Sequence, residues 1–345
     1  MEIHEVRDPA LALAQRVVVP HLGDDRVAPL DGRLHRDLTL STKGRTSQSS
    51  MRQVNSPYSR GTMSDRRPVA WAKKMIYVVA ATAAHALGRL VSTGHLGTLV
   101  ADEVRRRSWQ RRQTVETRTS HLIFHVPSEL TRWRAVTALR KEPETLDWID
   151  QMPDDSVLWD IGANVGVYTV YAARTKRIHV VACEPSIFNL EALVRNINAN
   201  ELTQLVTVVP LPLGQRIGRV TLGYTSTEIG GAFVEMLPVP APSSPRVTQP
   251  TNCITVDTLV LDLGSPAPTH MKIDVDGVEA QILEGATKTL RGVREVLIEM
   301  PEDAPGEPTR LSLRRAGFTF ARRDVSPLVT DSRYRASTNE LWTRQ

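Results

Sequence analysis

A glycine-containing turn in the middle of the chain has the residue types and spacing to bind a nucleotide-like cofactor. Residues 156 to 161 are mostly apolar, as in a buried parallel strand, and the turn that follows contains Gly162 and Gly166. Glycine at these positions permits a tight turn and a close approach of the backbone to a ligand. A helical pattern begins at Val165, so the free amides of its first turn favour a carboxylate or phosphate group above the strand end.

An acidic residue at the end of the next predicted strand narrows the class of cofactor. Residues 178 to 183 form that strand, and Glu184 lies 22 positions after Gly162. At this distance an acidic side chain accepts hydrogen bonds from the hydroxyl groups of a ribose. A dinucleotide fingerprint would also need glycine where the sequence has Asn164 and Val167. A purely structural interpretation also exists, in which the turn only packs a helix on a sheet and Glu184 is a solvated charge.

A second set of carboxyl groups follows two later strands. Asp274 and Asp276 come after a short apolar strand, and Glu299 closes the next one. Ligands bind at the carboxyl ends of strands in open α/β sheets, so we predict that Asp274 orients or deprotonates an acceptor hydroxyl and that Glu299 is the second candidate base. Asp276 and Glu279 also have the spacing of a helix capping box. No His/Asp spacing calls for Mg²⁺, and no metal site is predicted.

Four stretches that contain these residues resemble the FkbM family of methyltransferases. They are Lys141-Glu142-Pro143-Glu144-Thr145, Asp160-Ile161-Gly162-Ala163-Asn164-Val165-Gly166, Glu184-Pro185 and Lys272-Ile273-Asp274-Val275-Asp276-Gly277-Val278-Glu279. The likeness covers residues 130 to 345. The family more often has glutamate where this chain has Asp276, a change that keeps the charge and shortens its reach.

The resemblance implies S-adenosylmethionine as the cofactor. It implies that Asp160, Gly162, Asn164 and Gly166 hold the methionine part and Glu184 the ribose. It also implies an O-methyltransferase acting on a small-molecule acceptor such as a sugar, a polyketide or another natural product. The implied fold is α/β: a Rossmann-like class I methyltransferase with a doubly wound, mostly parallel, seven-stranded sheet and an N-terminal helical extension.

Two other functions stay open from the sequence. A nicotinamide-dependent oxidoreductase would use Glu184 in the same way, although the missing glycines disfavour it. A non-catalytic cofactor-binding or assembly protein would bind the cofactor and transfer no methyl group. Binding of a nicotinamide cofactor would favour the oxidoreductase. Binding of S-adenosylmethionine without turnover would favour the non-catalytic protein.

The chain of 345 residues is long enough for one large domain with an extension. Residues 1–67 are rich in Ser, Thr and Arg and lack a sustained period, which predicts disorder. Residues 68–127 are predicted to form a helical, basic extension, and residues 128–345 the methyltransferase domain. Two cysteines cannot build a disulfide framework, which favours a reducing, cytoplasmic setting.

The positive charge is concentrated before the predicted domain. Residues 1 to 125 hold 20 Lys and Arg against 11 Asp and Glu. Such an excess suits an anionic membrane surface or nucleic acid. No zinc spacing or aromatic RNA-binding motif accompanies it, so no nucleic acid is expected, whereas residues 69–112 are a candidate for membrane-surface contact. The apolar run at 75–87 is too short to span a membrane.

Several polar positions near the motifs have two interpretations. Arg134, Lys141 and Glu142 are able to line the cofactor cleft, but the sequence favours ordinary surface charge. The glycine turn at 229–233 is predicted to be mobile. The Pro/Ser-rich stretch 238–250 is predicted to be a loop, either a substrate lid or a plain surface connection.

Overall fold

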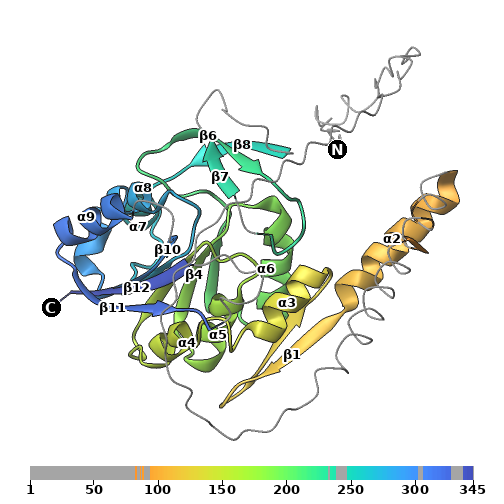
Figure 1. Ribbon diagram of the computed structural model, residues 1–345, viewed down its shortest axis with the longest axis horizontal. Coiled ribbons are helices and arrows are strands. Elements are labelled where there is room, and N and C mark those ends of the chain that lie inside the picture. The colour runs from red at the N-terminus through yellow and green to blue at the C-terminus, as the bar shows by residue number, and fades with distance from the viewer. Residues whose placement is uncertain are drawn as a thin grey trace, which may run out of the picture. The chain divides into compact units, whose positions relative to one another are not determined.

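The computed structural model describes residues 94–231, 234–237, 247–301, 306–327 and 337–344, with residues 82, 83, 86 and 88 (Figure 1). All of them belong to the unit Val69–Gln345. The disorder prediction for residues 1–67 falls outside the described residues, as does most of the apolar run 75–87.

The central element is a seven-stranded sheet with the order β11-β12-β10-β9-β3-β4-β5. In chain order its strands are β3 (Val157–Ile161), β4 (His179–Cys183), β5 (Val206–Val209), β9 (His270–Ile273), β10 (Glu295–Pro301), β11 (Thr319–Val325) and β12 (Ser337–Thr343). Strands β5, β4, β3, β9 and β10 pair in parallel, and β12 runs antiparallel to both β10 and β11. The predicted mostly parallel, seven-stranded sheet with an antiparallel end is confirmed.

Alternate residues of the central strands face two separate hydrophobic cores, because successive side chains of a strand point to opposite faces. Leu158 and Val180 join one core, and Trp159 and Val181 join the other. Helices α4 (Pro143–Asp150), α5 (Val167–Thr175) and α6 (Ile187–Ala199) supply the first core. The second core is supplied by α7 (Val256–Leu261), α8 (Glu279–Glu284), η2 (Thr289–Gly292) and α9 (Glu307–Arg315). The sheet is therefore doubly wound (Figure 1).

Two helices that precede the glycine turn begin where the sequence predicts. Helix α3 (Glu129–Thr137) has Ser128 as its N-cap, and the Ser128 hydroxyl accepts a hydrogen bond from the Thr131 amide in a complete capping box. Helix α4 has Pro143 in its first turn, where a missing amide donor costs nothing. These starts fix the direction in which both helices meet the sheet.

The segment before residue 128 is a helix followed by a hairpin. Helix α2 (Gly94–Gln110) leads into β1 (Arg112–Glu116) and β2 (His121–His125), which pair antiparallel. The β2 side chains Leu122 and Phe124 are buried in the same core as α5 and α6. The helical prediction for 68–127 is therefore wrong over the hairpin, and the domain boundary at 128 stays a prediction. Within the described residues, no helix is both long and apolar enough to cross a membrane.

A three-stranded antiparallel sheet is inserted between β5 and β9. Its strands are β6 (Gly218–Tyr224), β7 (Val234–Leu237) and β8 (Val247–Cys253), in the order β7-β6-β8. The loop prediction for 238–250 is wrong at residues 247–250, which pair with β6. Pro250 is accommodated because β8 is an edge strand, where a missing amide donor is tolerated.

Candidate active site

The turn after β3 has a backbone conformation that requires glycine at two positions. Gly162 has φ +86° and Gly166 has φ +84°. A Cβ atom at Gly162 would lie 1.9 Å from the carbonyl oxygen of Asp274, and one at Gly166 would lie 2.5 Å from Cδ1 of Leu193. Asn164 between them has φ 52°, a region that Asn adopts more readily than most residues. The turn therefore folds directly against the end of β9 and against α6.

Asp160 lies beneath this turn. Its buried carboxylate accepts a 2.6 Å hydrogen bond from the Thr169 hydroxyl of α5. Burial raises the pKa of Asp160, although the nearby ammonium of Lys272 opposes the rise. Asp160 does not line the pocket described below. Its contact thus connects the strand end to the helix, and the predicted contact with a cofactor stays a prediction.

Glu184 is brought to the same turn by β4. Its Oε2 accepts a hydrogen bond from the Asn164 amide at 2.7 Å, and its Oε1 accepts one from the Ser186 amide at 2.8 Å. Burial raises the pKa of Glu184 to about 7, and these amide hydrogen bonds limit the rise. Glu184 and Asn164 are therefore in direct contact. Binding of a ribose by Glu184 stays a prediction.

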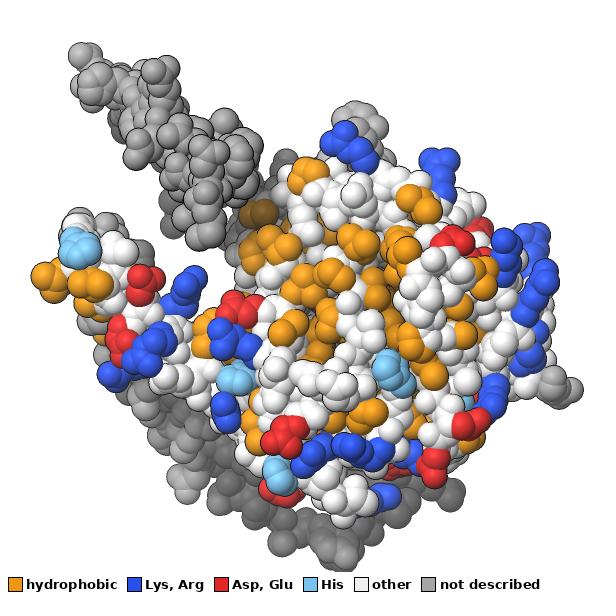
Figure 2. Space-filling model, turned by 180° about the vertical axis from the view of Figure 1, so that it is seen from behind, with side chains coloured by type: hydrophobic (Ala, Val, Ile, Leu, Met, Phe, Trp, Pro, Cys, Tyr) orange, Lys and Arg blue, Asp and Glu red, His pale blue; other side chains and the backbone are white. Residues whose placement is uncertain are grey.

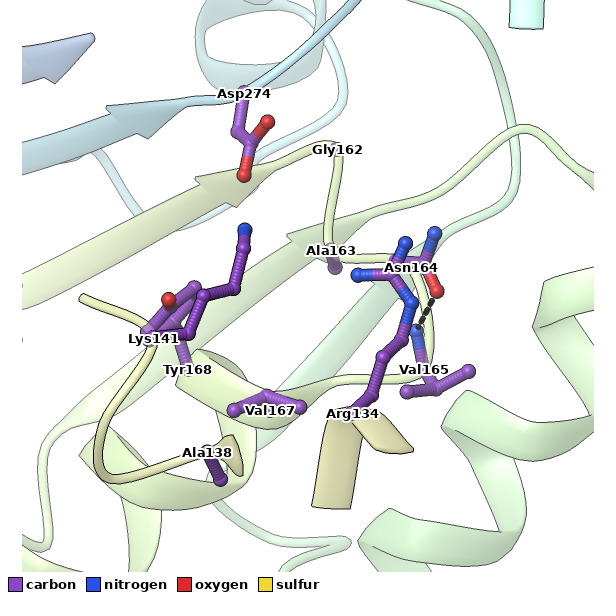
Figure 3. Close-up of a pocket in the computed structure, with 10 residues that line it drawn as sticks. All are labelled: Arg134, Ala138, Lys141, Gly162, Ala163, Asn164, Val165, Val167, Tyr168 and Asp274. Carbon is purple, nitrogen blue, oxygen red and sulfur yellow. Dashed lines mark hydrogen bonds between the residues drawn. The ribbon is translucent and has the colours of Figure 1, made fainter. Parts of the chain in front are cut away.

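A pocket opens above the glycine turn (Figure 3). It is lined by Arg134, Ala138, Lys141, Gly162, Ala163, Asn164, Val165, Val167, Tyr168 and Asp274. The lining combines predicted cofactor residues with the predicted acceptor residue Asp274. Figure 3 shows the ammonium of Lys141 pointing toward Asp274 and the guanidinium of Arg134 beside Asn164. Cofactor and acceptor groups therefore share one cavity.

The lining residue Asp274 interacts with a buried lysine, Lys272, and with a second carboxyl group, Glu299. Lys272 is 2% exposed, and its Nζ donates a 2.6 Å hydrogen bond to Oδ2 of Asp274. Burial opposes ionisation of Asp274, but Lys272, a hydrogen bond from Glu299 and the charge of Lys141 hold the pKa of Asp274 well below its usual range. Burial and the Asp274 charge raise the pKa of Glu299 well above its usual range. Of the two carboxyl groups, Asp274 is thus the more readily ionised, and Glu299 is the one that more readily holds the proton they share.

Three residues expected to be surface charges line this cavity or lie directly behind its lining. Lys141 lines the pocket and pairs with Glu142, which is only 1% exposed. Burial disfavours the charged form of Glu142, but Lys141 and Lys272 bring its pKa below the usual value. Arg134 also lines the pocket. The surface-charge interpretation is wrong for all three residues. The residue types alone did not predict their burial, because the contacts that bury them come from parts of the chain far away in the sequence.

The glycine turn of the inserted segment is held in place by hydrogen bonds. The Gly231 carbonyl accepts from the Asn164 side chain at 2.9 Å. The Gly230 amide donates to Oδ1 of Asn189 at 2.9 Å, and the Gly230 carbonyl accepts from Nε of Arg134 at 2.6 Å. The prediction of mobility over 229–233 is therefore wrong for the described residues 229–231, which are tied to the cofactor turn, α6 and α3.

The carboxyl groups after Asp274 have structural positions. Helix α8 has Val278 as its N-cap without a side-chain cap, so the capping box predicted with Asp276 as N-cap is wrong. The buried Glu279 accepts a 3.1 Å hydrogen bond from the Gly277 amide instead. Burial raises the pKa of Glu279. In the part of the chain that the structure describes, no group of three or more His, Cys, Asp or Glu residues is arranged to bind a metal ion.

Comparison with known protein families identifies the domain that contains the glycine turn and Asp274. Residues 160–320 match the family model of the methyltransferase FkbM domain. An FkbM methyltransferase domain therefore lies within this chain. The family resemblance predicted from the four sequence motifs is confirmed, and with it the methyltransferase class. S-adenosylmethionine is the cofactor of this class, so the cofactor prediction is confirmed at the level of the family.

Known proteins similar to this chain include a hexuronic acid methyltransferase, AglP, from Haloferax volcanii. The two sequences are 27% identical over 216 residues, which are 59% of this chain and 83% of AglP. A crystal structure of methyltransferase FkbM from Methylobacillus flagellatus is 17% identical, with a TM-score of 0.38, over 55% of this chain and 44% of that chain. TrmK from M. capricolum, solved with S-adenosylhomocysteine, is 10% identical, with a TM-score of 0.38, over 58% of this chain and 67% of that one.

Proposed function

We propose that this protein transfers the methyl group of S-adenosylmethionine to a hydroxyl group of a sugar or another small natural product. The observation that carries the proposal is the shared pocket, in which the glycine turn and the ionised Asp274 line one cavity. AglP, the similar protein that acts on a hexuronic acid, supports a sugar as the acceptor.

The residues present fit the cofactor. A Cβ at Gly162 or Gly166 would overlap the Asp274 carbonyl or the Leu193 side chain, so glycine lets the turn pack tightly on the end of β9 and on α6. Gly162 itself lines the pocket, where its backbone would face the methionine part. Asn164 shapes the turn between them. Glu184 would accept hydrogen bonds from the ribose hydroxyls, because each carboxylate oxygen can accept more than the one amide hydrogen bond it already has. Asp160 acts through Thr169 as a positioning residue.

When bound, S-adenosylmethionine supplies an activated methyl group, so the protein mainly has to align the acceptor oxygen and accept its proton. Asp274 is ionised and lines the pocket, so it would accept a hydrogen bond from the acceptor hydroxyl and then its proton. Its low basicity suffices if the proton leaves only after the oxygen has begun to bond to the methyl carbon. Before the proton is transferred, the hydrogen bond from Lys272 keeps Asp274 ionised.

Glu299 has a different part in this proposal. Burial and the Asp274 charge raise its pKa well above the usual range, so it holds a proton more readily than Asp274 and is the weaker candidate for the base. Its hydrogen bond to Asp274 leaves that carboxylate oriented by Lys272 on one side and Glu299 on the other. We therefore assign proton acceptance to Asp274 and make Glu299 a residue that positions Asp274.

The first experiment is isothermal titration calorimetry with S-adenosylmethionine, S-adenosylhomocysteine and NAD. We expect binding of both sulfur compounds and none of NAD; the reverse result would favour an oxidoreductase. A transfer assay with labelled S-adenosylmethionine against paired neutral and acidic sugars follows. Binding without transfer to any hydroxyl acceptor would favour a cofactor-binding protein without methyltransferase activity.

Two further proposals concern where the enzyme works. Both cysteines, Cys183 and Cys253, are buried free thiols, which supports a reducing, cytoplasmic setting. Helix α2 exposes Leu96, Leu99 and Val104 and also carries arginines in its second half. Figure 2 shows hydrophobic and basic side chains together at the left of the view. This pattern supports contact with an anionic membrane surface. Co-sedimentation with anionic but not zwitterionic vesicles is the expected result.

A further inference from the structure

The pocket contains or adjoins three cationic side chains, and they differ in their acidic partners. Lys272 forms a salt bridge with Asp274 at 2.6 Å, and Lys141 forms one with Glu142. Arg134 forms no salt bridge with any residue that the structure describes. The positive charges of both lysines are thus matched by carboxylates of the protein, whereas that of Arg134 is matched by none of them.

Arg134 is held in a geometry that leaves its terminal amino groups available. Its Nε donates to the Gly230 carbonyl at 2.6 Å, which within the described part of the chain is the single hydrogen bond of this side chain. Gly230 is itself fixed by Asn189, and α3 is fixed by its capping box at Ser128. Figure 3 shows the guanidinium beside Asn164 at the mouth of the glycine turn. The anchor is therefore rigid, and Nη1 and Nη2 form an open fork.

The fork itself suits a singly charged anion, although carboxylates lie in its neighbourhood. Burial lowers the pKa of Arg134, while the charges of Asp274, Glu184 and Glu142 oppose that effect. A guanidinium stays protonated in proteins, so Arg134 is a partly desolvated cation without a paired carboxylate. A planar carboxylate matches the two coplanar amino groups of the fork. A dianionic phosphate would put excess negative charge near Asp274 and Glu184 with only one unmatched cation to balance it.

We propose that Arg134 binds a carboxylate group of a molecule held in the pocket. This inference rests on the proposed function, because that function supplies two molecules able to carry such a group. One source is the methionine carboxylate of the cofactor, and the other is the carboxylate of an acidic sugar acceptor. The chemistry recognised is the same in both cases, and a test with two arms separates them.

The first arm compares S-adenosylmethionine with its decarboxylated form, which keeps the sulfonium and the amino group. If the cofactor is the source, the wild-type protein binds S-adenosylmethionine more tightly by about 10- to 100-fold, the range for hydrogen bonds to charged groups. Arg134→Met then removes this preference and leaves the affinity for the decarboxylated form nearly unchanged. Arg134→Lys restores part of it. Arg140→Met, at an exposed arginine just beyond the same helix, serves as the control.

The second arm compares methyl glycosides of glucuronic acid and glucose as acceptors. If the acceptor is the source, Arg134→Met raises KM for the glucuronide by roughly 10-fold or more, leaves the glucoside unchanged, and does not alter the cofactor preference. Thermal unfolding of each variant identifies any general loss of stability.

The two proposals fail in different ways. If wild-type protein binds neither form of the cofactor, the proposed function is overturned. If wild-type protein binds the cofactor, but Arg134→Met changes both cofactor forms equally and both acceptors equally, the proposed function stands and the role of Arg134 as a carboxylate receptor is overturned. A selective loss in either arm supports the receptor and names its ligand.

Discussion

Two neighbouring strand ends make up the candidate site, and they are built by different physical means. The turn after β3 is defined by backbone conformation and excluded volume, with positive φ angles at Gly162 and Gly166. The end of β9 and the adjacent β10 are defined by charge, with Lys272, Asp274 and Glu299 sharing protons and hydrogen bonds. The first region has no tolerance for added atoms, whereas the second depends on the balance of its charges.

Gly162→Ala is expected to have the largest effect on cofactor binding. The added Cβ would overlap the Asp274 carbonyl oxygen, at 1.9 Å, in a conformation that already disfavours a side chain. The turn must therefore shift, and we expect cofactor affinity to fall by at least about 100-fold, which corresponds to roughly 2.7 kcal/mol. Calorimetry measures this. Gly292→Ala, where a Cβ meets nothing within 4 Å, is the matched control. Unchanged affinity in Gly162→Ala would mean that excluded volume does not define this region.

Asp274→Asn tests the charged region directly. The amide keeps the shape of the side chain but accepts no proton, so kcat should fall by on the order of 10²- to 10⁴-fold. Cofactor affinity should change little, because the turn does not depend on the Asp274 charge. Single-turnover transfer and calorimetry on the same preparation give both numbers. Undiminished transfer would exclude Asp274 as the proton acceptor.

Glu299→Gln sharpens the comparison within the charged region. Burial and the Asp274 charge favour the protonated form of Glu299, so a glutamine would replace one hydrogen-bond donor with another. We expect kcat to fall by less than about 10-fold, well below the effect of Asp274→Asn. The ratio of the two kcat values is the decisive quantity. Equal losses would move the role of base to Glu299.

A further prediction concerns stability rather than activity and involves Glu184 beside the glycine turn. Its pKa is raised by burial from 4.5 to about 7 in the folded protein, so the folded state binds the proton more tightly than the unfolded state. The stability linked to this proton is fully present below pH 4.5 and is lost as the pH rises through 7, in total about 3 kcal/mol. Glu184→Gln should remove this part of the pH dependence. Urea unfolding at pH 5 and pH 8 measures the free energy of unfolding of the wild-type protein and of Glu184→Gln. If this free energy changes equally between the two pH values in both proteins, Glu184 is ionised throughout.

Local patterns account for the parts of the site that were predictable. The strand, turn and helix from 156 to 172 could be predicted because apolar spacing and two glycines determine structure over only a few residues. Glu184 and Asp274 were placed at strand ends by the same reasoning. The structure puts Asn164 in contact with Glu184 and folds Gly162 against Asp274, so these local predictions meet at one edge of the sheet.

What the sequence determined by itself was the order of strands and helices, the glycine positions and the family, since these follow from period, backbone sterics and motif. Only the tertiary structure decided which charges enter the pocket. Arg134 and Lys141 precede the glycine turn by more than twenty residues, and their surface interpretation failed because burial depends on what packs above them. The proton on Glu299 likewise depends on Asp274, a partner from another strand. Charge state is a property of the assembled environment, and no local pattern of residues contains it.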